Sequence, residues 1–287
     1  MTDRIERLLN AGAEIQREVW GDVRFSHSLL CSVNLPYRNP TDAVRSYTRS
    51  SGPVSLLREA GKVFTPSGWV DVGLPYGAKS RLLLLHLCSL AVKQQSPIVE
   101  VADSFTAFCR DLGIDTNGRN LRIIKDQIRR MSAVSMRLGL QQGGELVVFQ
   151  GSIFDGVRVE VTSDWRQMPM WTNEIRFSPR FYESLKNHAV PLDARALKAI
   201  RHSARSIDIY LWLCSRLWRV PAGKPQKIRW TSLKHQFGQP SQSLKSFKAA
   251  FSTALRQVLV VYPTAQVEPV WGGIELRRSP PAIPMKD

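Results

Sequence analysis

Apolar residues at helical spacing, followed by alternating ones, mark a first series of elements in the middle of the chain. They predict a helix over Lys79–Gln95, a short helix over Ser104–Leu112 and a long helix over Asn117–Leu138. Leu146–Phe149 and Val157–Val161 follow with the spacing of two strands, and turn residues lie between them. The pattern predicts a helix-turn-helix that is followed by a β-hairpin.

A second series follows in the same order. Helices are predicted over Ala194–Arg219, Thr231–Phe237 and Ser241–Val260, and Val267–Leu276 is predicted to fold back on itself at Gly272-Gly273. A helix-turn-helix with a β-hairpin is the pattern of a winged helix. The chain is therefore expected to contain two.

The two series also align residue by residue. Ser104–Gly113 aligns with Arg229–Gly238, and the apolar and basic positions of Leu121–Ile128 align with those of Leu244–Phe251. Each of the two aligned segments that contain the short helices ends on a glycine. We expect these glycines to adopt the left-handed backbone conformation. Any pair of amphipathic helices is an alternative source of such a repeat.

The N-terminal part is patterned differently. Residues 4–19 read as a helix, whereas Gly21 to Pro75 is broken by proline and glycine into short apolar pieces. We therefore divide the chain into an N-terminal helix and irregular arm (1–75), a first winged-helix domain (76–188) and a second, strongly basic one (189–287). The expected fold class is α+β, mainly helical, with two tandem winged-helix domains after the arm.

Composition limits the function classes. Of 287 residues, 43% are hydrophobic and 22% charged, which is a globular and not a disordered composition. The four cysteines form no CxxC pair, and the histidines lack metal-ligand spacing, so we expect no metal and no cofactor. The longest apolar stretch, Leu82 to Val92, is too short to cross a bilayer. A cytoplasmic protein with buried, reduced thiols and no membrane partner is expected.

The charge indicates a polyanionic partner. The chain has 40 Lys and Arg against 24 Asp and Glu, a net charge of +16. Residues 194–287 hold 16 of the basic and 4 of the acidic residues, so +12 lies in the last third. A basic third beside a nearly neutral body is typical of a nucleic-acid contact surface.

The faces left after the apolar stripes supply the candidate DNA-binding residues. The second long helix has no acidic residue between Ser241 and Val260, and its outward side mixes hydrogen-bonding and cationic side chains, as phosphates and base edges require. A solvated helix face is the alternative. The candidates on the second long helix are Ser241, Gln242, Lys245, Lys248, Ser252 and Thr253. Those on the first long helix are Arg119, Arg122, Lys125 and Arg129, with Asp126, Arg130 and Arg137 on the same face. Arg277 and Arg278 follow the second hairpin and are candidates for a wing contact.

No catalytic residue is assigned. His202 and Arg205 form an H-x-x-R pair of the kind used by tyrosine recombinases, with Tyr262 as the corresponding nucleophile. The pair is too short to be specific, and it lies on a predicted helix of the second series. We interpret the chain as a binding protein and keep the recombinase as a remote alternative.

Several segments resemble the plasmid-encoded RepA-type replication initiators, in the order of that family. They are Gly73–Leu84, Ser104–Ile114, Val190–Leu197, Ile207–Leu213, Trp230–Gly238, Phe247–Phe251, Val258–Pro263 and Gly272–Arg278. The resemblance implies a non-enzymatic initiator that binds repeats in double-stranded plasmid origin DNA, promotes duplex opening and recruits the host replication initiator and helicase. It also implies repression of its own promoter and a homodimer as one of its forms. A transcriptional repressor without initiator activity is the alternative.

Overall fold

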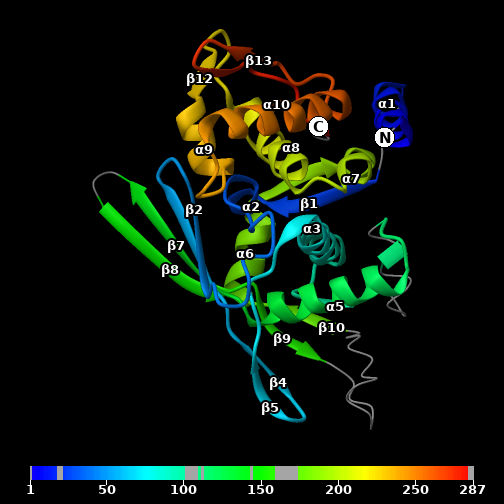
Figure 1. Ribbon diagram of the computed structural model, residues 1–287, viewed down its shortest axis with the longest axis vertical. Coiled ribbons are helices and arrows are strands. Elements are labelled where there is room, and N and C mark those ends of the chain that lie inside the picture. Colours follow the sequence, from blue (N-terminus) through cyan, green and yellow to red (C-terminus); the bar gives the residue numbers. More distant parts are fainter. Residues whose placement is uncertain are drawn as a thin grey trace. The chain divides into compact units, whose positions relative to one another are not determined.

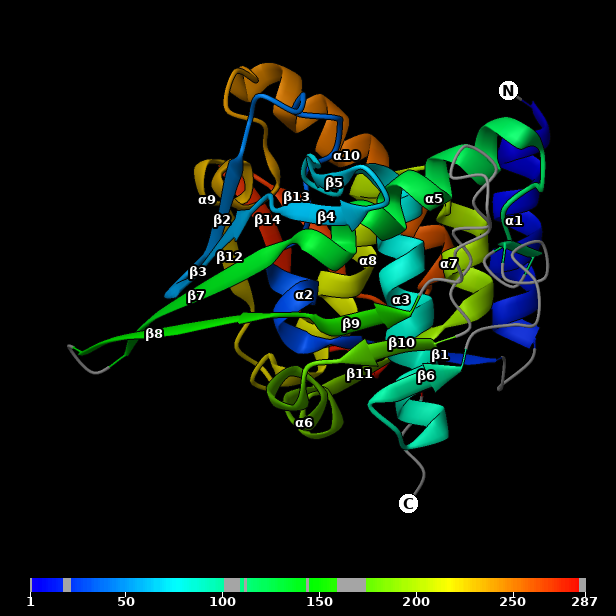
Figure 2. The same cartoon turned by 90° about the horizontal axis from the view of Figure 1, so that it is seen from below.

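The computed structural model describes residues 2–17, 22–100, 109–110, 113–142, 145–158 and 174–283 (Figures 1 and 2). The chain forms two compact units. The first combines residues 1–34 with 189–287, and the second is residues 35–188.

The first unit joins both ends of the chain. Its sheets are β1 paired with β11, and the three strands in the order β12-β14-β13. The long helix α10 packs against α8, α1 and α9. The elements are α1 (Thr2–Arg17), β1 (Val23–His27), α2 (Ser28–Ser32), β11 (Ala189–Asp193), α7 (Ala194–Ile200), α8 (Ala204–Arg216), the 3-10 turn η1 (Leu217–Arg219), β12 (Gln226–Arg229), α9 (Trp230–Phe237), α10 (Leu244–Val261), β13 (Val267–Val270) and β14 (Gly273–Leu276).

The second unit is built on a four-stranded sheet in the order β2-β3-β7-β8, with a three-stranded sheet β6-β10-β9 and a separate hairpin β4-β5. Helix α3 is buried from Ser80 to Ser89, as expected of a helix with apolar residues around most of its circumference. The elements are β2 (Ser46–Ser51), β3 (Val54–Glu59), β4 (Lys62–Thr65), β5 (Gly68–Asp71), α3 (Gly77–Gln94), β6 (Ile98–Glu100), α5 (Gly118–Ala133), β7 (Ser135–Gln142), β8 (Glu145–Ser152), β9 (Phe154–Arg158), β10 (Glu174–Phe177) and α6 (Pro179–Asn187).

The expected fold class is wrong. Of the described residues, 46% are helical and 27% lie in strands of several sheets, a mixed α+β fold and not a mainly helical pair of tandem winged helices. In the first series, the long helix ends at Ala133, and Ser135 to Leu138 belong to strand β7 instead. Strand β8 pairs with β7 and β9 pairs with β10, so the predicted hairpin does not form. The predicted short helix over 104–112 lies largely outside the described residues.

Residues 1–75 do not form one irregular arm. Residues 1–34 belong to the first unit, where β1 pairs with β11, and the rest belong to the second unit, where β3 pairs with β7. The predicted helix over Ala194–Arg219 is divided at residues 201–203, because Ser203 caps a new helix by accepting a hydrogen bond from Ser206 N–H.

The rest of the second series matches its prediction element by element. Helices α9 and α10 lie where the pattern placed them, and β13 and β14 form a hairpin that turns at Trp271-Gly272. Gly113 has a φ of +65°, as expected, but Gly238 has a φ of −81° and so is not left-handed. Gly238 is instead required by a close approach, since a Cβ there would lie 2.3 Å from the Lys234 carbonyl oxygen.

Candidate nucleic-acid interface

Helix α10 begins at a side-chain N-cap. Ser243 is extended, and its hydroxyl accepts a hydrogen bond from Ser246 N–H at 3.2 Å, which satisfies one of the open donors of the first turn. The preceding loop is closed by Gln242 N–H donating to the Gln239 carbonyl at 3.0 Å. The start and direction of α10 are therefore fixed by local hydrogen bonds.

The inward face of α10 is anchored by aromatic packing. Phe247 and Phe251 are fully buried, with ring centroids 5.5 Å apart, and Phe237 of α9 lies 5.6 Å from Phe251. Trp230 packs edge-on against Phe251 at 5.9 Å. Because these rings determine which face points inward, the opposite face of α10 is held toward solvent.

That outward face is cationic and polar. Lys245 and Thr253 are exposed, and Lys248 and Ser252 are half-exposed on the same side. The Lys248 ammonium lies 5.9 Å from the centre of the Trp230 ring, a cation–π contact that orients the lysine side chain. The helix contains no acidic residue along its whole length.

Arg256 also lies on this face, although it is not among the residues predicted from the sequence. It is exposed, and its guanidinium reaches Thr253 Oγ1 at 3.5 Å. Its spacing of eleven residues from Lys245 is three helical turns, so the periodicity was sufficient to find it.

Ser241 and Gln242 precede the helix and lie in the loop. Ser241 is exposed, whereas the Gln242 carboxamide oxygen accepts hydrogen bonds from Arg205 and from Gln239 N–H, each at 3.4 Å. Gln242 therefore shapes the loop and does not lie on the helix face with the lysines.

The three-stranded sheet adds a second cationic surface to this unit. Lys227 and Arg229 are exposed on β12, and Trp271 at the tip of the β13-β14 hairpin is 92% exposed. The Lys227 ammonium lies 5.6 Å from the Trp271 ring centre. Arg277 and Arg278 follow β14 and are exposed, and Arg277 forms an ion pair with Glu275.

The remaining candidates lie on α5 of the second unit. Asn117 caps this helix by accepting from Asn120 N–H at 2.9 Å. Arg119 and Arg122 are exposed, and Lys125 and Arg129 are half-buried. The candidate residues are thus divided between the two units, with α10 in one and α5 in the other.

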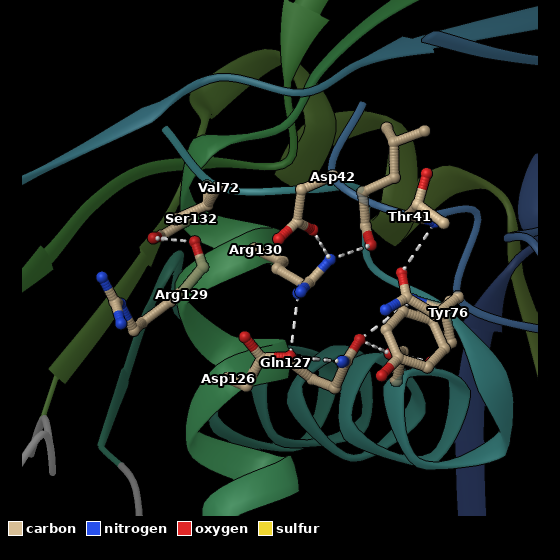
Figure 3. A network of polar contacts seen from close by, with 12 residues as sticks. Thr41, Asp42, Val72, Tyr76, Asp126, Gln127, Arg129, Arg130 and Ser132 are labelled. Carbon is tan, nitrogen blue, oxygen red and sulfur yellow. Dashed lines mark hydrogen bonds and ion pairs between the residues drawn. The ribbon is translucent and has the colours of Figure 1, made fainter. Parts of the chain in front are cut away.

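Arg130 is not on the outward face of α5, contrary to the sequence interpretation. Its side chain is 9% exposed and lies 3.0 Å from the Asp42 carboxylate and 2.8 Å from that of Asp126 (Figure 3). It also donates to the Leu74 carbonyl at 3.3 Å, while Gln127 accepts a hydrogen bond from Tyr76 N–H at 2.9 Å. Arg130 and Gln127 hold the segment before α3 against α5.

Comparison with known proteins decides the family. The sequence profile described as "Plasmid encoded RepA protein" matches residues 74–232, more than half of the chain. The chain belongs to this family. The matched region includes α5 and the start of α9, and α10 lies beyond it.

Two solved structures share the fold of this RepA family member, and both are crystal structures of domains 2 and 3 of RctB. One, of selenomethionine derivatives, has a TM-score of 0.54 at 12% identity and covers 88% of this chain and 98% of its own. The other has a TM-score of 0.52 at 12% identity and covers 86% and 94%. No curated protein sequence matches the chain.

The tyrosine of the recombinase alternative is not accessible in this RepA family member. Tyr262 is 2% exposed, and its hydroxyl donates to the Pro280 carbonyl at 2.8 Å. Burial raises the pKa of Tyr262 well above its ordinary value, which disfavours a nucleophilic phenolate. Arg205 is engaged with Gln242, and His202 is exposed.

The described residues contain no cluster of three His, Cys, Asp or Glu side chains placed to hold a metal ion. The four cysteines are buried, and no two of them form a disulfide. Burial raises the pKa of Cys31 to about 12, so its thiol is unreactive near neutral pH. Within the described part of the chain, no helix is both long and apolar enough to span a bilayer.

Proposed function

We propose that this chain is a plasmid replication initiator that binds repeated sequences in double-stranded origin DNA and promotes opening of the adjacent duplex. Membership of the plasmid-encoded RepA family supports the initiator role. The acid-free outward face of α10, with Lys245, Lys248 and Arg256, is the observation that carries the DNA contact.

The chemistry of this face suits a helix that enters a major groove. Lysine and arginine neutralise phosphates, and Ser252 and Thr253 offer hydroxyl groups to phosphate oxygens or base edges. The buried Phe247 and Phe251 fix the rotation of α10, so these side chains share the solvent-facing side of the helix. The Arg119, Arg122, Lys125 and Arg129 side chains of α5 supply a second, phosphate-directed contact.

The mechanism in this proposal is binding and duplex deformation, without a bond-making step and without a cofactor. The initiator also recruits host replication proteins, including the host initiator and the replicative helicase, acts as a homodimer in one of its forms, and represses its own promoter. These parts rest on the family resemblance. A cytoplasmic location with the plasmid is part of the same proposal.

Footprinting on the DNA that flanks its own gene tests the proposal, at fixed salt and with excess competitor DNA. The expected result is protection of several directly repeated sites, which disappears in Lys245→Ala with Lys248→Ala. The matched control is Lys93→Ala with Lys186→Ala, which removes the same charge from the other unit and keeps the footprint. Protection of a single palindrome over the promoter would favour a repressor, and no protection above competitor would contradict the proposal.

A further inference from the structure

The β4-β5 hairpin of the second unit carries two large aromatic side chains in solvent. Phe64 is 72% exposed and Trp69 is 68% exposed. They lie directly opposite each other in the strand register, with ring centroids 5.3 Å apart and planes tilted by 56°. Two exposed aromatic rings in contact on an ordered element are typical of an interaction site.

Hydrogen bonds and ion pairs stabilise the hairpin that carries these rings. Lys62 and Arg45 both contact the Asp71 carboxylate at 2.9 Å, and Thr65 Oγ1 donates to the Gly68 carbonyl at 2.8 Å. Arg45 also donates hydrogen bonds to the carbonyls of Val72, Ala60 and Gly61, at 2.8, 2.9 and 3.0 Å. These bonds hold together the residues on either side of the hairpin. The backbone that carries the two rings is therefore held in place before a ligand binds.

The base of the hairpin packs on the end of α5. A Cβ at Gly61 would lie 2.2 Å from the Ala133 carbonyl oxygen, so the two backbones are in close contact. From this point β4 extends away from the rest of the second unit (Figure 1). Three residues of strand carry the chain from Lys62 to its end, a reach of about 10 Å.

A row of cations on α5 leads to that base. Arg122, Lys125 and Arg129 are spaced by three and four residues, so they lie on one face of the helix and approach its C-terminal end. Figure 3 shows the Arg129 side chain pointing away from the Arg130 network, so the two neighbouring arginines have separate environments. The second unit thus combines a cationic helix face with an adjacent aromatic hairpin.

We infer that this combination binds an unpaired DNA strand, with its bases stacked on Phe64 and Trp69 and its phosphates along α5. Proteins that hold single strands pair a cationic track for the backbone with aromatic side chains for the bases. Bases inside a duplex already stack on each other and offer no free face. The inference rests on the proposed function, because an initiator that opens a duplex creates the strand that this surface would hold.

The test measures binding of the full-length protein to labelled oligo-dT and, separately, to a duplex origin repeat. Phe64→Leu with Trp69→Leu keeps the surface apolar but removes both rings. It is expected to weaken oligo-dT binding about 100-fold, roughly tenfold for each stacked base, and to leave duplex binding unchanged. Trp69→Phe retains a ring and is expected to keep oligo-dT affinity close to that of the unmodified protein.

Leu146→Ala with Val148→Ala is the matched control, since these residues are 80% and 70% exposed on another hairpin of the same unit but carry no ring. It is expected to leave oligo-dT binding unchanged. Retained oligo-dT affinity in the double leucine variant, or an equal drop in duplex binding, would overturn the inference. Absence of repeat binding in the unmodified protein would instead count against the proposed function, so the two failures are distinguishable.

Discussion

Arg130 Nη1 lies 3.0 Å from Asp42 Oδ1, whereas Arg129, the preceding residue of α5, points away from this ion pair (Figure 3). Two adjacent arginines on one helix therefore have different roles. Arg130 is enclosed by polar partners that fix the fold of the second unit, and Arg129 lies with Arg122 and Lys125 in the proposed DNA-contacting row.

Replacing each of these arginines separates stability from DNA binding. Arg130→Ala is expected to lower the free energy of unfolding by about 2–3 kcal/mol, because it removes a nearly buried side chain with several polar partners. Arg129→Ala should change the free energy of unfolding by less than about 0.5 kcal/mol. It should reduce the salt slope of duplex DNA binding by about one. Urea unfolding and salt titrations measure both quantities. A large stability loss in Arg129→Ala would contradict this division.

Gly273 is expected to be required for the three-stranded sheet of the first unit. A Cβ at this position would lie 1.9 Å from the Ile228 carbonyl oxygen, so strand β14 cannot keep its pairing with β12. Gly273→Ala should lower the free energy of unfolding by roughly 2 kcal/mol or more, measured by thermal unfolding. Gly151→Ala, where nothing lies within 4 Å of the new atom, is the control and should behave like the unmodified protein.

Tyr262→Phe tests the structural role of the tyrosine against the nucleophilic one. Removing its hydroxyl eliminates the hydrogen bond to Pro280 and should lower the free energy of unfolding by about 1 kcal/mol. Duplex binding is expected to stay the same, and neither protein should form a covalent DNA adduct on a denaturing gel. An adduct that forms with the unmodified protein and is absent from Tyr262→Phe would restore the recombinase interpretation.

The sequence was sufficient for elements whose partners are local. Helices α9 and α10 and the β13-β14 hairpin follow from periodicity and the turn at Gly272, and Phe247 and Phe251 of α10 are buried, as its apolar stripe indicates. The first series failed where pairing is long-range. Val54–Glu59, assigned to the arm, is strand β3 and draws residues 135–140 into β7, which ends the helix early.

The candidate site shows the same limit. Lys245 and Lys248 could be assigned because the apolar stripe of α10 determines its outward side. Arg130 could not, because its partner Asp42 is 88 residues earlier in the sequence. The Phe64 and Trp69 pair was equally hidden, since only the hairpin register places the two rings together.

The salt dependence of duplex binding tests the proposed role of α10 most directly. The affinity for the footprinted repeat is measured over a range of salt concentrations for the unmodified protein, Lys245→Ala with Lys248→Ala, and the Lys93→Ala with Lys186→Ala control. The slope of log affinity against log salt falls by close to one unit for every phosphate that the protein no longer neutralises. The account predicts a slope reduced by about two in the α10 variant alone. An unchanged slope in that variant would exclude α10 from the interface.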